Sequence, residues 1–478
     1  MTEPRPREQY LRSSRFRPLG LAAALAVLIP AVPAWAHVSE QSFVLLLPTG
    51  LYITAGVAAV ALTVVLLALL PDDLAQAMFA HRTTLRAGWP RAETATGALA
   101  GLVLIALIVL GTLGSRDPLV NPLPLAIWTL FWVVFVSLQG YLGDLWRWIS
   151  PFTLPGRLLS ARSDRPAPLS LPAAWGVWPG VLCFLAFALF YLVDLAPDDP
   201  DRLAVVVAGY LLFTLLGMGL FGARTWLERV ECFSMLLAHY AAIAAAGRRE
   251  GRLAFGLPGW QIVEAPALSR SAAVFVLCLL GTGTFDGLNE TFWWLGQIGV
   301  NPLEFPGRSA VIRENTLGLL ATNLLVVAAF ALAVWLGLAL SDARERFAEA
   351  FGRLARAILP IALAYHAAHF LTLALVNGQY ALKAADDPLG RGDSLLGLES
   401  FQVTTGFFNS RDTVEVIWLT QAGLIVAGHI LSILASHAIA LSMFRDGRRA
   451  VLSQVPMAAF MIVYTLFGLT LLAAPRGA

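Results

Sequence analysis

The sequence predicts an all-α protein: a polytopic transmembrane helix bundle of about ten spans behind a cleavable signal peptide, with one further interfacial helix on the inner side. Three observations predict this class. Hydrophobic residues make up 58% of the 478 residues and charged residues only 13%, whereas soluble domains carry roughly 25% charged residues. Apolar runs of about 20 residues, the length that crosses a bilayer as a helix, recur along the chain. Arginines concentrate in every second loop between those runs.

The first 36 residues predict a secretory signal peptide. Residues 1–18 hold five arginines, and the apolar stretch Leu19–Val32 follows them. Ala34-Trp35-Ala36 then has the small-residue pattern of a cleavage site. On this prediction the mature chain begins at His37, and residues 37–478 form a single transmembrane helical domain.

Ten apolar runs after the signal have the length and composition of membrane-spanning helices. They cover residues 50–70, 94–114, 122–142, 174–194, 203–222, 267–286, 316–340, 355–377, 414–443 and 454–474. The stretch Trp226–Gly247 is also apolar, but Glu228, Glu231 and His239 interrupt it. We interpret this stretch as an interfacial or re-entrant helix on the inner side of the membrane.

The distribution of arginine orients the predicted spans. With the mature N-terminus outside, the five loops assigned to the cytoplasm hold three to five arginines each, and the outer segments hold at most three basic residues each. Basic residues favour cytoplasmic loops. The sequence therefore predicts a protein of the bacterial inner membrane, embedded in the lipid bilayer, with both mature termini in the periplasm. A net charge of only +2 provides no basic field that would attract a nucleic acid.

Three histidines lie near the middle of two predicted spans, where ionisable residues are costly and often functional. His366 and His369 are three positions apart, so they share one face of their helix. His429 lies at a similar depth in the span 414–443. Three imidazoles at one depth predict a site for a divalent transition metal such as zinc, copper or iron. The alternative is that these histidines form only structural hydrogen bonds between helices.

Two carboxylates stand at the outer end of the span 267–286. Asp286 ends that span, and Glu290 follows about one helical turn later. We interpret both as candidate catalytic groups, acting as a general base or as outer partners of the metal ligands.

His37 is a separate candidate metal ligand. After cleavage it would offer an α-amine and an imidazole in the periplasm, and such nitrogen ligands suit Cu(II). The alternative is an incidental polar start of the mature chain.

Several short motifs occur in one order along nearly the whole mature chain. They are Ala36-His37, Asp144–Phe152, Trp226–Ser234, Thr284–Leu288, Ala368–Leu373, Asp387–Gly390, Gly428-His429 and His437–Leu441. In this combination the chain resembles bacterial integral membrane proteins known as fenitrothion hydrolases, membrane components of an organophosphorus-ester hydrolase. The resemblance implies hydrolysis of a phosphotriester or phosphorothioate, an apolar small molecule that partitions into the bilayer.

The resemblance carries no assignment of catalytic residues, so the roles follow from the chemistry of the reaction. Such hydrolysis needs an activated water and a cation for the phosphoryl oxygen, and a metal supplies both. On this hypothesis His366, His369 and His429 hold the metal, and Asp286 or Glu290 is the general base.

Three other functions stay open on the sequence. Ten spans with titratable groups inside them also suit a transporter. His37 and the buried histidines suit copper or other metal handling at the periplasmic face. The third alternative is a non-catalytic anchor for a second membrane or periplasmic subunit.

Overall fold

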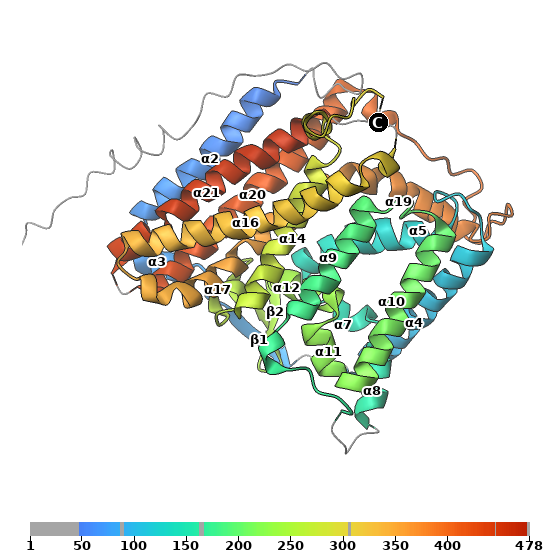
Figure 1. Ribbon diagram of the computed structural model, residues 1–478, viewed down its shortest axis with the longest axis horizontal. Helices are drawn as coiled ribbons and strands as arrows, with labels where there is room; N and C mark the ends of the chain where they lie inside the picture. Colours follow the sequence, from blue (N-terminus) through green and yellow to red (C-terminus); the bar gives the residue numbers. More distant parts are fainter. Residues whose placement is uncertain (1–46, 87–89, 162–166, 305–306, 445, 476–478) are drawn as a thin grey trace, which may run out of the picture.

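The computed structural model describes residues 47–86, 90–161, 167–304, 307–444 and 446–475. Within these residues the protein is helical apart from one small sheet (Figure 1). The predicted signal peptide and His37 lie outside the described residues.

Eight helices in the described part of the chain are long and apolar enough to cross a membrane. They are α2 (Thr49–Leu69), α4 (Pro90–Leu113), a continuous run of α5 (Pro122–Pro124), the π-helix η2 (Leu125–Phe135) and α6 (Val136–Leu142), then α10 (Pro200–Phe221), α14 (Arg270–Leu288), α16 (Ile312–Leu340), α20 (Arg411–Met443) and α21 (Gly447–Ala473). A helix satisfies its backbone hydrogen bonds internally, which a bilayer requires of any segment that spans it. The predicted helical membrane fold is therefore present.

Two of the ten predicted spans differ in the structure. The span 174–194 is α9 (Trp178–Val193), which has only 16 residues because it begins beside Pro179 and ends before Asp194. The span 355–377 is divided between α18 (Leu359–His369) and α19 (Leu371–Asp386), which meet at a bend of 56°. Counting that bent pair as one span raises the number of candidate spans to nine.

The stretch 226–247, predicted to be one interfacial or re-entrant helix, is divided into two helices in the structure, and the second of them is buried rather than interfacial. The stretch consists of α11 (Ala223–Arg229) and α12 (Cys232–Ala241), followed by the strand β2 (Ala246–Arg249). Glu231 separates the two helices because its carboxylate accepts the N–H groups of Phe233 and Ser234 and so caps α12. α12 packs against α6 and α9, and most of its residues are buried, so it is part of the core.

A three-stranded antiparallel sheet, which the sequence did not predict, joins two loops at one end of the bundle. Its order is β1 (Arg82–Arg86), β3 (Arg252–Phe255), β2. Glu250 and Gly251 connect β2 to β3, and both have positive φ, as a two-residue type I′ hairpin turn requires. β1 lies in the loop that follows α2, and β3 lies in the loop that precedes α14. Because β1 pairs with β3, both loops lie on the same side, as the predicted topology requires.

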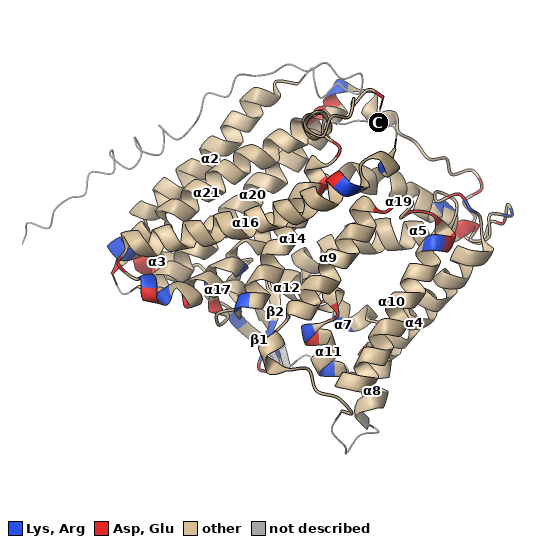
Figure 2. Ribbon diagram, viewed as in Figure 1, with Lys and Arg blue, Asp and Glu red and all other residues tan. Residues whose placement is uncertain are grey.

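The long helices form two groups around a central layer. In Figure 1, α2, α16, α20 and α21 lie on one side and α4 and α10 on the other, with α9, α12 and α14 between them. Burial agrees with this arrangement: 72% of the apolar stretch of α14 is buried, but only 11% of that of α4. Charged residues gather toward the ends of the helices, and the long stretches between are apolar (Figure 2).

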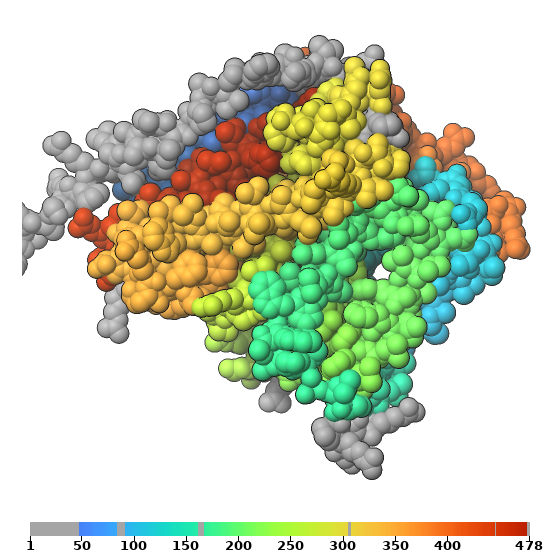
Figure 3. All heavy atoms as spheres, viewed as in Figure 1, coloured from blue at the N-terminus to red at the C-terminus, as the bar shows by residue number. Residues whose placement is uncertain are grey.

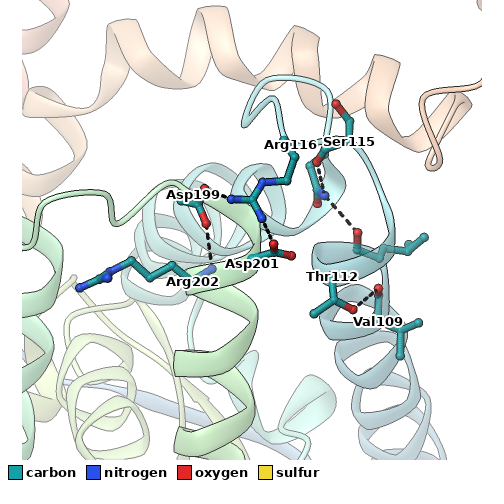
Figure 4. A network of polar contacts seen from close by, with 9 residues as sticks. Val109, Thr112, Ser115, Arg116, Asp199, Asp201 and Arg202 are labelled. Atoms are coloured by element: carbon teal, nitrogen blue, oxygen red, sulfur yellow. Dashed lines mark hydrogen bonds and ion pairs between the residues drawn. The ribbon is translucent and has the colours of Figure 1, made fainter.

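An ion-pair network joins α4 to α10 at the end opposite the sheet (Figure 4). Arg116, just after α4, pairs with Asp199 at 2.8 Å and also with Asp201. Asp199 is the N-cap of α10, since its carboxylate accepts the backbone N–H of Arg202 at 2.9 Å. This network holds the two helices together at that end.

Replacing Asp199 with alanine should destabilise the protein by about 1 kcal/mol, since the change removes a helix cap. The measurement is the thermal unfolding midpoint of the detergent-purified protein. Asp201→Ala is the control, because it removes a second partner of Arg116 and leaves the cap in place. Equal unfolding midpoints for the two variants would contradict the capping role.

Candidate functional site

A small buried pocket lies between α9, α14, α18 and η2. Its volume of about 30 Å³ leaves room for roughly one water molecule. Its polar and aromatic lining includes Trp132, Tyr191, Asp286, Tyr365, His366 and His369. His366 and His369 thus share one face of α18, as their spacing predicts.

His369 and Asp286 form the ionisable pair of this pocket. His369 Nε2 lies 3.5 Å from Asp286 Oδ2, and their side chains are only 8% and 13% exposed. The ring of Tyr365 stacks on the imidazole with a centroid distance of 5.7 Å. A buried histidine beside a carboxylate can exchange a proton with a bound water, because the imidazolium that forms stays paired with the negatively charged carboxylate.

His366 has a different environment in the same pocket. Its Nε2–H donates to the backbone carbonyl of Trp132 at 2.8 Å. The two rings meet edge to face at 5.1 Å. This nitrogen therefore carries the proton, and His366 joins α18 to η2.

α20 supports the end of α18 from the other side. Gln421 donates from Nε2 to the carbonyl of Ala368 at 2.8 Å, one of the last carbonyls of α18. This bond lies beside His369, where α18 gives way to α19. Gln421 therefore helps to hold the bend that positions His369.

His429 does not join the other two histidines. Its Nδ1–H donates to the carbonyl of Ile425 at 2.8 Å, its Nε2 is buried without a hydrogen-bond partner, and its nearest ring is Tyr464 of α21. The reason is helix rotation. Gly428 faces α18, since a Cβ there would lie 2.7 Å from the carbonyl oxygen of Pro360. One residue further along, the helix has turned by about 100°, so His429 faces α21.

The predicted metal site is therefore not assembled. In the described part of the chain no group of three or more His, Cys, Asp and Glu side chains is placed to hold a metal ion. His366 already uses Nε2 on a carbonyl, and His429 is absent from the pocket. The residues present do not fit a metal, and His37 lies outside the described residues.

Glu290 is also separated from the pocket. It lies in the turn after α14, is exposed, and is not part of the pocket lining. The helix ends at Leu288, so the chain leaves the helical path before Glu290. Of the two predicted carboxylates, only Asp286 reaches His369.

A much larger apolar cavity lies on the other side of Trp132. Its volume is about 1220 Å³, and α4, η2, α9 and α10 form most of its wall. Trp132 lines both this cavity and the small pocket, and its ring contacts Phe187 at 4.8 Å. Figure 3 shows an opening between α9 and α10 at this place. Hydropathy alone did not reveal this cavity or Trp132, because every wall residue also suits lipid contact.

These features define a polytopic helical membrane protein with a buried, ionisable pocket beside an apolar cavity. No protein-family model, no curated protein and no solved structure matches the chain.

Proposed function

We propose that this protein hydrolyses an apolar ester inside the membrane, with His369 and Asp286 as its acid–base pair. The observation that carries the proposal is the 3.5 Å approach of these two side chains in a pocket with room for one water. The motif resemblance supports an organophosphorus ester as the substrate class. The apolar cavity behind Trp132 supports a substrate that arrives from the bilayer.

The pocket holds the groups that the proton transfers of this reaction need. The oxygen of the bound water attacks phosphorus while the pair takes one of its protons. The bond from phosphorus to the leaving alkoxide or phenoxide breaks, and the proton then passes to that oxygen. Asp286 stabilises the imidazolium that forms, as the carboxylate does in other histidine-based hydrolases. No step runs through a metal, because the described residues assemble no ligand set for one.

The orientation proposed for the molecule follows from its arginines. We infer that the end with the sheet faces the cytoplasm of a bacterium and that the mature termini are periplasmic. The sheet brings together two loops that are both rich in arginine, which supports this orientation. On this topology the His369–Asp286 pair lies in the outer half of the bundle.

Replacing Asp286 with asparagine should lower kcat at least about 100-fold, since general acid–base catalysis typically contributes that much. The assay follows nitrophenolate release from an apolar aryl phosphotriester by protein in lipid nanodiscs. Asp393→Asn, in the exposed outer loop, is the matched control. KM should change little, because Asp286 acts on water. Undiminished turnover by the Asp286 variant, or none by the wild type, would overturn the proposal.

A second candidate is proton-coupled transport, which the bend between α18 and α19 favours. Broken helices at titratable groups are a feature of many transporters. If transport is the function, a proton gradient should drive uptake of the same ester into proteoliposomes, and Asp286→Asn should abolish the uptake. Hydrolysis without gradient-dependent uptake would decide for the enzyme.

A further inference from the structure

A cluster of arginines surrounds one buried carboxylate near the sheet. Arg147 of α7 (Trp146–Ile149) bonds to Glu93 of α4. Arg157 of α8 (Thr153–Ala161) and Arg248 of β2 each lie 4.0 Å from the same carboxylate. Glu93 is only 7% exposed, whereas the three arginine side chains are between 21% and 43% exposed. We call these four residues the arginine cluster; it carries three positive charges against one negative charge.

The arginine cluster lies at one end of the apolar cavity. Thr96, Ala100, Val103 and Leu107 of α4 all line that cavity. With Glu93 they follow spacings of three, four, three and four, so all five share one face of the helix. Glu93 therefore stands one turn beyond the cavity wall, on the same face.

A second segment places the arginines beside the cavity. Ile149 and Pro151 line the cavity and follow Arg147 by two and four residues. The cavity thus changes from an almost wholly apolar lining to a basic end within about one helical turn. This end is also the one that carries the sheet and that we assign to the cytoplasmic side.

The size and opening of the cavity indicate a large apolar ligand. Pockets for drug-sized ligands have volumes of roughly 300–1,000 Å³, and this cavity has about 1220 Å³. Figure 3 shows an opening between α9 and α10, and the cavity wall on these two helices includes exposed apolar side chains such as Leu182, Val206 and Phe213. Acyl chains can therefore enter from the side without crossing water.

We propose that the cavity and the arginine cluster together bind an anionic phospholipid, with the acyl chains in the cavity and the phosphate at the arginines. Guanidinium groups suit phosphate because they donate paired, charge-assisted hydrogen bonds. Basic pockets between helices on the cytoplasmic side are the usual sites of such lipids. The inference goes beyond the proposed function and does not depend on hydrolysis, since the arginine cluster and His369 belong to different ends of the bundle.

The first experiment tests the headgroup. Phosphatidylglycerol or phosphatidylcholine with identical acyl chains is added to the delipidated full-length protein in detergent, and bound lipid is measured by native mass spectrometry. Each basic residue near a lipid surface contributes about fivefold in affinity. The wild type should therefore prefer phosphatidylglycerol at least about fivefold at low salt.

The variant Arg157→Gln/Arg248→Gln should lose this preference and still bind phosphatidylcholine as the wild type does. Arg224→Gln is the control, because Arg224 is 88% exposed on the same predicted side and pairs only with its helix neighbour Glu228 among the described ion pairs. Equal binding of both lipids by the wild type would overturn the headgroup assignment. Displacement of the lipid by inorganic phosphate would assign the arginines to a free ion and would also overturn it.

The second experiment tests the cavity. Gly209 of α10 lines the cavity, and a Cβ built there meets no atom within 4 Å, so Gly209→Phe places a ring in the open space. This variant should bind both lipids at least about tenfold more weakly. Gly219→Phe is the control, since Gly219 is on the same helix, has equally open surroundings and does not line the cavity. Unchanged lipid binding by a monodisperse Gly209→Phe protein would overturn the proposal.

Discussion

Replacing Gly337 with valine should leave little correctly folded protein, because α16 and α21 touch at this glycine. A Cβ at Gly337 would overlap the carbonyl oxygen of Ser453 and lie 2.9 Å from its carbonyl carbon. Small residues are what allow membrane helices to approach so closely. The obstacle is backbone, so no side chain can rotate away, and we expect a cost above the roughly 1–3 kcal/mol typical of overpacking.

The measurement for Gly337→Val is the monodisperse fraction in size-exclusion chromatography, together with the thermal unfolding midpoint of that fraction. Gly423→Val of α20 is the control, because a Cβ there meets no atom within 4 Å. The control should behave as the wild type. A Gly337→Val protein with the yield and midpoint of the control would show that the two helices are not in this contact.

Replacing Glu231 with leucine should destabilise the protein by about 3 kcal/mol or more. Glu231 is fully buried. Its carboxylate accepts the N–H of Phe233 at 3.0 Å, the N–H of Ser234 at 2.7 Å and the hydroxyl of Tyr210. Leucine fills similar space but accepts none of these bonds, and each buried donor left without a partner costs about 1–3 kcal/mol.

Glu228→Leu is the matched control for Glu231→Leu, since Glu228 is only three residues away and its side chain is 61% exposed. Surface changes of this kind usually alter stability by about 0.5 kcal/mol or less. The comparison is made on thermal unfolding midpoints in one detergent. Similar midpoints for the two variants would mean that the buried cap contributes nothing.

Most of the helices could be predicted, but the breaks between them could not. Hydropathy depends on the length and polarity of a segment, so it located α2, α10 and α20 to within a few residues. It joined α18 to α19 because Phe370 and Leu371 at the bend are as apolar as their neighbours. Hydropathy also indicated that Glu231 interrupts a single helix, whereas its carboxylate caps the start of a second helix, α12.

The candidate site could be predicted only within a single helix. The spacing of His366 and His369 placed both on one face of α18, and the structure places both in one pocket. Asp286 reaches that pocket from α14, but no spacing indicated this contact. His429 has the right depth and the wrong rotation, because Gly428 takes the face that α20 turns toward α18.

The sequence by itself determined that this is a helical membrane protein, because a bilayer accepts only segments that are apolar for about 20 residues and satisfy their own backbone. Only the tertiary structure decided that His369 meets Asp286, that His429 faces α21, and that an apolar cavity lies beside three arginines. The physical reason is that hydropathy fixes how deep a residue lies in the membrane. How far each helix rotates depends on close contacts between helices, such as those at Gly428 and Gly337.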